Sequence, residues 1–75
     1  MGGRAARDFL AKRSLTLTGH RTSVALEPEF WTALESLAAA RRIAVAALVA
    51  EVDAARPQGQ TLASALRLTV LRSRS

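Results

Sequence analysis

Residues 21–26 alternate strictly between two sets of side chains. In an extended backbone one set lies on one face of the strand and the other set on the opposite face, since successive side chains point in opposite directions. The first set is Arg21, Ser23 and Ala25, and the second is Thr22, Val24 and Leu26. The alternation predicts a short strand with a polar outer face and a mainly apolar inner face.

The strand is followed directly by a predicted helix. Pro28 has its φ angle fixed near the helical value and lacks the N–H that a first helical turn leaves unpaired, so Glu27 is expected as N-cap and Pro28 as first helical residue. Apolar side chains then recur at helical spacing to about Arg41. Two further helices are expected, from about Val45 to Ala55 and, after a Pro- and Gly-containing break at 56–60 and a cap at Thr61, from Leu62 to about Leu71.

The chain is short for the apolar surface that these elements carry. It has 75 residues, 49% of them hydrophobic, and no cysteine that could form a disulfide. A single strand beside helices is also an unprotected edge. We therefore expect a homodimer in which residues 21–26 pair with the same strand of a second chain. The residues expected in the dimer core are Val24, Leu26, Phe30, Trp31, Leu34, Leu48 and Val49.

The segments before the strand are less clearly determined. Residues 14–18 alternate again and are followed by Gly19-His20, a plausible two-residue turn. They could pair with 21–26 as a hairpin or across the dimer, or form an extended lead-in over the core. Residues 1–13 are expected to be a flexible basic arm. The chain is thus divided into this arm, a domain over 14–56, and a C-terminal helix and tail over 57–75 packed on the same domain.

The net charge of +5 is concentrated near the ends of the chain. Residues 1–21 contain five bases, Arg4, Arg7, Lys12, Arg13 and Arg21, against one acid, Asp8. Such a distribution suits a nucleic-acid partner. A membrane partner is disfavoured, because the most apolar run, 43–50, is too short to span a bilayer and no signal-peptide pattern is present. We expect a cytoplasmic protein associated with the nucleoid.

Residues that could carry chemistry are scarce. The single histidine, His20, has no nucleophile or carboxylate partner in the pattern, and Glu51 and Asp53 have the spacing of a solvated helix face. The sequence therefore predicts no enzyme, no catalytic residues, no metal site and no cofactor.

The order strand, helix, short turn, helix over residues 21–55 resembles the ribbon-helix-helix family, the MetJ/Arc type of DNA-binding protein. The resemblance rests on the Arg-x-Ser-x-Ala strand, the Leu-Glu-Pro-Glu-Phe-Trp-x-x-Leu junction and the Ile-Ala-Val-Ala-Ala-Leu-Val entry to the second helix. From Lys12 to Leu71 the chain also resembles a small bacterial subfamily with a flanking Arg-Ser-Leu-Thr-Leu segment and an added C-terminal helix. The implied fold is mainly α with a short β-ribbon, in an intertwined homodimer with an intermolecular antiparallel sheet.

The resemblance also implies roles for particular residues. In that family three alternating side chains of each strand face the bases in the major groove, and here they correspond to Arg21, Ser23 and Ala25. Arginine can donate twice to guanine, serine can donate or accept, and alanine can contact a thymine methyl. The phosphate-binding residues expected are Lys12, Arg13 and, through backbone N–H groups at the start of the second helix, Ala44, Val45 and Ala46.

Three functions are compatible with this sequence. A DNA-binding transcriptional regulator, most simply a repressor acting on double-stranded DNA, is favoured by the element order and the charge together. A less specific chromosome-associated DNA binder is the first alternative, since Ala25 reads bases poorly. An antitoxin of a toxin–antitoxin pair is the second, although such tails tend to fold on binding and residues 62–71 look capped and ordered. The operator, any small-molecule effector and any higher-order assembly on DNA are not encoded in a readable pattern.

Overall fold

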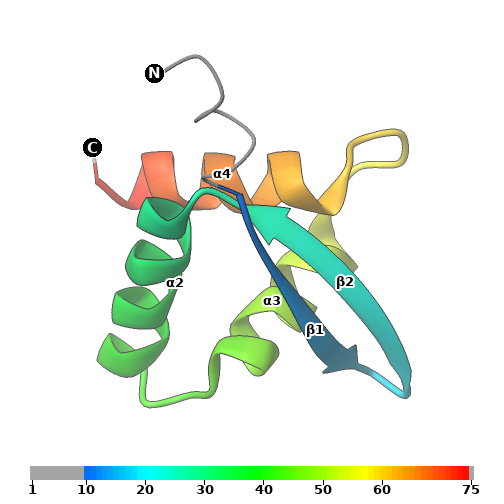
Figure 1. Cartoon of the computed structure of the whole chain (residues 1–75), viewed down its shortest axis with the longest axis horizontal. Coiled ribbons are helices and arrows are strands. Elements are labelled where there is room, and N and C mark those ends of the chain that lie inside the picture. The colour runs from blue at the N-terminus through cyan, green and yellow to red at the C-terminus, as the bar shows by residue number, and fades with distance from the viewer. Residues whose placement is uncertain (1–9, 75) are drawn as a thin grey trace, which may run out of the picture.

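The computed structural model describes residues 10–74 of the chain. A β-hairpin of two antiparallel strands, β1 (Ala11–Leu17) and β2 (His20–Leu26), is followed by three helices, α2 (Pro28–Ala40), α3 (Val45–Ala55) and α4 (Leu62–Ser73). The hairpin packs on all of them: β1 contacts α3, and β2 contacts α2 and α4 (Figure 1). The predicted mainly helical fold with a short β-ribbon and an added C-terminal helix is confirmed.

The two strands are joined by a tight turn at Thr18-Gly19, one residue earlier than the predicted Gly19-His20 turn. Thr18 has a φ of 39° and Gly19 a φ of 89°. Positive φ at both central residues is the pattern of a type I′ turn, whose twist matches that of the flanking strands. Glycine takes the second of these positions without strain, and His20 is left to begin β2.

The two strands of one chain pair with each other. Residues 21–26 pair with β1 of the same chain as an antiparallel hairpin, one of the pairings that the sequence left open, and pairing with the same strand of a second chain stays a prediction. β1 also begins at Ala11, which places Lys12 and Arg13 in the sheet instead of the predicted arm. Residues 1–9, the rest of that arm, lie outside the described residues. Association of two chains stays a prediction.

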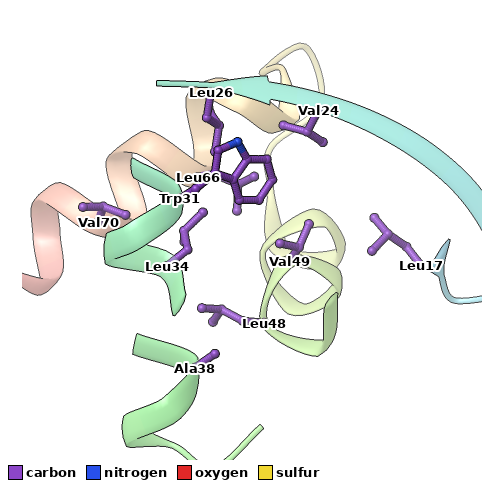
Figure 2. Close-up of a cluster of buried hydrophobic side chains, with 10 residues drawn as sticks. All are labelled: Leu17, Val24, Leu26, Trp31, Leu34, Ala38, Leu48, Val49, Leu66 and Val70. Atoms are coloured by element: carbon purple, nitrogen blue, oxygen red, sulfur yellow. The ribbon is translucent and has the colours of Figure 1, made fainter. Parts of the chain in front are cut away.

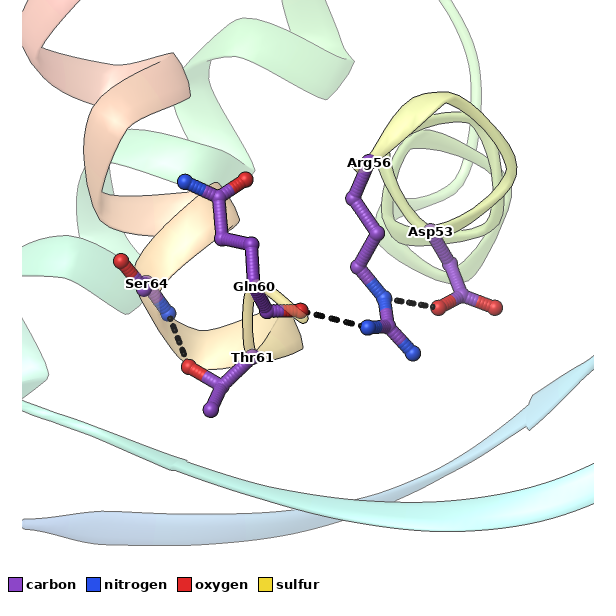
Figure 3. Close-up of polar contacts among 5 residues, drawn as sticks. All are labelled: Asp53, Arg56, Gln60, Thr61 and Ser64. Carbon is purple, nitrogen blue, oxygen red and sulfur yellow. Dashed lines mark hydrogen bonds and ion pairs between the residues drawn. The ribbon is translucent and has the colours of Figure 1, made fainter. Parts of the chain in front are cut away.

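The helix starts follow the sequence closely. Glu27 is the N-cap of α2 with Pro28 in its first turn, and Thr61 caps α4 by accepting a hydrogen bond from the Ser64 N–H at 3.1 Å. In the loop between α3 and α4, Arg56 donates to the Asp53 carboxylate at 2.7 Å and to the Gln60 carbonyl (Figure 3). These contacts fix the direction in which α4 leaves α3.

The end of α2 has a Schellman motif without glycine. The Ile43 N–H donates to the Ala38 carbonyl and the Arg42 N–H to the Ala39 carbonyl, both at 3.0 Å. Arg42 adopts a φ of 60°, a conformation that glycine takes more easily. Ile43 is half-buried against the core, and this contact helps to hold the turn.

The core is closed within one chain. Trp31 lies at its centre, with residues of the hairpin and of α3 and α4 around its ring (Figure 2). Six of the seven residues expected in a dimer core are buried without a second chain, and the seventh, Phe30, is half-buried at the rim. One chain can bury these residues because β1 adds Leu17, which is 1% exposed, to the core, and α4 adds Leu66 and Val70. The buried cluster is Leu17, Val24, Leu26, Trp31, Leu34, Ala38, Leu48, Val49, Leu66 and Val70.

Candidate nucleic-acid interface

The outer face of β2 carries the three residues predicted to read DNA bases. Arg21 and Ser23 are exposed and Ala25 is half-buried, while Val24 and Leu26 on the opposite face are 5% and 0% exposed. The strand phase predicted from the alternation is therefore the phase that the structure has. The packed inner face fixes which side chains point outward, since a shift by one residue would exchange the two faces.

The hairpin brings a second row of polar side chains beside this one. Lys12, Ser14 and Thr16 of β1 are exposed, and their Cα partners across the sheet are Ala25, Ser23 and Arg21, respectively. Directly opposite residues share a face of an antiparallel pair. The Ser14 and Ser23 hydroxyl oxygens lie 3.5 Å apart. From the sequence, Lys12 was expected to bind phosphate and Ser14 and Thr16 had no role, although their alternation with Leu15 and Leu17 was visible.

Arg13 lies on the inner side of the hairpin, away from this outer row. Its guanidinium forms an ion pair with Glu35 of α2 at 2.9 Å, and its Cζ atom lies 4.6 Å from the centroid of the Trp31 ring. The structure thus separates Arg13 from Lys12, with which the sequence had grouped it as a phosphate contact. The reason is the strand itself, which turns neighbouring side chains to opposite faces.

A hydrogen bond ties β1 to α2 beside that ion pair. The Trp31 indole N–H donates to the Ala11 carbonyl at 2.7 Å. A buried indole N–H needs such an acceptor, because an unpaired polar group in the core is costly. β1 is held at this end by Trp31 and Arg13, and at its other end by the buried Leu17.

The start of α3 forms a separate group of backbone donors. Ala44 is the N-cap and makes no side-chain cap bond, and the first helical N–H groups to reach a carbonyl are those of Ala47 and Leu48, which both donate to Ala44. The N–H groups of Val45 and Ala46 precede them and face outward from the first turn. Ala44, Val45 and Ala46 thus lie at a helix start, at the turn after α2 and not on the ribbon, and phosphate binding there stays a prediction.

Three arginines outside the hairpin, Arg41, Arg56 and Arg67, are paired with acids. Arg41 forms a two-point contact with Glu51 at 2.7 and 3.0 Å, and Arg67 contacts Glu27 at 3.0 Å. The hydrogen bond and charge of Arg41 hold the pKa of Glu51 below its ordinary value of 4.5. A backbone hydrogen bond at Glu27 itself, followed by the bond from Arg67, lowers the pKa of Glu27 in the same way.

The outer face of the ribbon has cations without such partners. Over the described part of the chain, residues 10–74, neither Lys12 nor Arg21 forms an ion pair. Neither strand contains an acidic residue. Among the described residues, the charges of Lys12 and Arg21 are therefore not neutralised by an acidic side chain.

The comparison with protein-family models decides the family. A model described as a ribbon-helix-helix domain matches residues 10–73, which span both strands and the three helices almost to the end of α4. The chain belongs to the ribbon-helix-helix family. Ribbon-helix-helix proteins are DNA-binding regulators that contact DNA with strands. A search of curated proteins and a search of solved structures each gave no match.

The described part of this ribbon-helix-helix chain has neither a metal-ligand cluster nor a membrane-spanning helix. Among residues 10–74, no three His, Cys, Asp or Glu side chains are grouped so that they could hold a metal ion. Within the same residues, every helix is too short or too polar to cross a membrane.

Proposed function

We propose that this chain is a sequence-reading transcriptional regulator, a repressor that inserts its β-ribbon into the major groove of double-stranded DNA. The observation that carries the proposal is the outer face of the hairpin, where Arg21 and Ser23 are exposed beside a strand free of acidic residues. The major groove is wide enough for a two-stranded ribbon. Arg21 can donate twice to guanine, Ser23 can donate or accept, and Ala25 can contact a thymine methyl.

The backbone at Ala44, Val45 and Ala46 is the proposed phosphate anchor. N–H groups at a helix start attract anions, and phosphate contacts position a protein without specifying sequence. Arg13 is not part of this anchor, because it is engaged with Glu35 and Trp31. Helix α4 is packed into the core of the single chain, where its Leu66 is 0% exposed. This packing favours a regulator, because the tail of an antitoxin tends to fold only when it binds its toxin.

The regulator is proposed to act as a homodimer in the cytoplasm, on the nucleoid. One chain leaves apolar surface uncovered, since Leu71 is 55% exposed and Phe30 is only half-buried. Sedimentation of the free protein and of its DNA complex measures the assembly. The expected mass is that of two chains, with an unfolding midpoint that rises with protein concentration. The mass of one chain under both conditions would contradict the dimer.

DNA selected from a random pool, followed by titration at fixed salt, tests the function. Arg21→Ala should cost about 1–3 kcal/mol on the selected site and relax the preference at one base pair. Arg74→Ala removes the same charge from the end of α4 and serves as control, with little effect on base preference. If the assembly neutralises about six phosphates, log K should fall with log[salt] at a slope near −5. A pool that yields no preferred sequence would identify the less specific DNA binder instead.

A further inference from the structure

The hairpin contains an internal repeat that its pairing turns into approximate two-fold symmetry. A half-turn about the centre of the ribbon, at the Ser14–Ser23 pair, exchanges the two antiparallel strands, so that each residue of β1 corresponds to the residue nine positions later in β2. The outward residues of β1, read in chain order, are a cation, a serine and a small side chain, and those of β2 are the same. The corresponding pairs are Lys12 with Arg21, Ser14 with Ser23, and Thr16 with Ala25.

The inward residues repeat as well at the core positions. Leu15 and Leu17 correspond to Val24 and Leu26, and three of these four side chains are buried. Corresponding positions of the two strands therefore lie on the same side of the hairpin: those at the core positions face inward, and those between them face outward. The inward repeat is broken at Ala11, which corresponds to His20, and at Arg13, which corresponds to Thr22 and is bound to α2.

We propose that β1 is a second DNA-reading strand, so that Lys12, Ser14 and Thr16 discriminate bases together with the three residues of β2. This proposal rests on the function proposed above. Neighbouring strands lie about 4.8 Å apart, and opposite side chains on one face lie about 5 Å apart. A groove that receives Arg21 and Ser23 therefore also receives Thr16 and Ser14. Lysine can donate to guanine O6 and N7, and hydroxyl groups can donate or accept on any base edge.

β1 is also positioned firmly enough to read bases. The Trp31 N–H holds the Ala11 carbonyl, Arg13 is clamped between Glu35 and the Trp31 ring, and Leu17 is buried in the core. Side chains on a rigid element discriminate better than those on a loop, since little order has to be created on binding. A flexible arm at Lys12 would instead follow the phosphates without regard to sequence.

Base preferences of variants selected from a random DNA pool test the inference. Lys12→Ala should lower the discrimination at one base pair by about five- to a hundredfold, the range for a good side-chain–base contact. Within each half-site, this base pair and the one relaxed by Arg21→Ala should lie on opposite sides of the position that the centre of the ribbon contacts. Lys12→Arg retains a donor of two hydrogen bonds and should restore the preference.

A matched pair of threonine variants adds a second measurement. Thr16→Val removes a hydroxyl from the outer face of β1, and Thr32→Val removes one from an exposed position on α2. Thr16→Val should reduce discrimination by about two- to tenfold, as expected for one neutral hydrogen bond, and Thr32→Val should leave it unchanged. Thermal unfolding followed by circular dichroism establishes that each variant is folded.

The contrary results are distinct. If Lys12→Ala weakens binding evenly on all sequences, or has no effect while Arg21→Ala relaxes the preference, β1 does not read DNA and the inference is wrong. If the wild-type protein selects no sequence and Arg21→Ala changes nothing, the proposed function fails and the inference fails with it.

Discussion

Leu17→Ala is the sharpest test of the docked hairpin. Leu17 is 1% exposed and lies against the core beside Val49 (Figure 2). Removing its three outer carbon atoms loses roughly 2.4 kcal/mol of transfer free energy at about 0.8 kcal/mol each. The cavity left behind raises the cost toward the range of about 2–5 kcal/mol seen for such changes. Since Leu17 adjoins the turn, where the chain can partly collapse, we expect about 2–3 kcal/mol.

That loss is large for a chain of this size. At about 0.05–0.15 kcal/mol per residue the whole domain has a free energy of unfolding of roughly 4–11 kcal/mol. The midpoint of thermal unfolding should fall by about 8–24 °C, since each kcal/mol shifts it by about 4–8 °C in a small domain. Urea unfolding followed by circular dichroism, at one protein concentration, measures the change, and the dependence on urea should keep its slope.

Leu10→Ala provides the matched control, because Leu10 is 42% exposed just before β1. It makes the same chemical change and should cost about 0.5 kcal/mol or less. Equal stabilities of the two variants would refute the reasoning. β1 would then be a mobile segment, and the closed single-chain core described above would not exist in solution.

Two further predictions concern the helix starts. Thr61→Ala should lower the free energy of unfolding by about 1 kcal/mol, because the Ser64 N–H loses its acceptor, and Thr61→Ser should retain most of it; urea titration distinguishes them. Glu27→Gln should lower the melting temperature at pH 7, and this difference from wild type should shrink as the pH falls below 4.5. Folding lowers the pKa of Glu27, so the stability that its carboxylate contributes is complete above the unfolded pKa and is lost as the pH falls through the folded pKa. Glu29→Gln in the same helical turn controls for the helix dipole, and a pH-independent difference between wild type and Glu27→Gln would contradict the assignment.

Much of the fold was accessible from local pattern. The alternation over residues 21–26 gave the correct strand phase, and Pro28 and Thr61 marked helix starts that the structure has. These features depend on residues close in sequence, and their physical causes are local as well. For the same reason the alternation alone was enough to place Arg21 and Ser23 on an outer face.

The pairing of the ribbon could not be read in this way. An alternating strand has the same pattern whether its partner strand belongs to the same chain or to another. The hairpin turn also requires a positive φ at Thr18, and threonine is not a residue type that indicates such a conformation. Arg13 shows the second limit. A basic residue beside Lys12 looks like a second phosphate contact until the strand is known to continue through it, which turns it toward Glu35. The position of this part of β1 depends on the hydrogen bond from Trp31 to the Ala11 carbonyl, and these two residues are twenty positions apart in the sequence.

The Thr18-Gly19 turn changes the molecularity of ribbon formation. A ribbon made from two chains forms in a second-order reaction and can exchange strands with any similar chain in the same cell. A ribbon joined by a two-residue turn forms in first-order folding, at a rate that does not depend on protein concentration. The two strands of the hairpin then always come from the same chain, even where related proteins are abundant, and a scarce protein retains an intact hairpin at any dilution at which it stays folded.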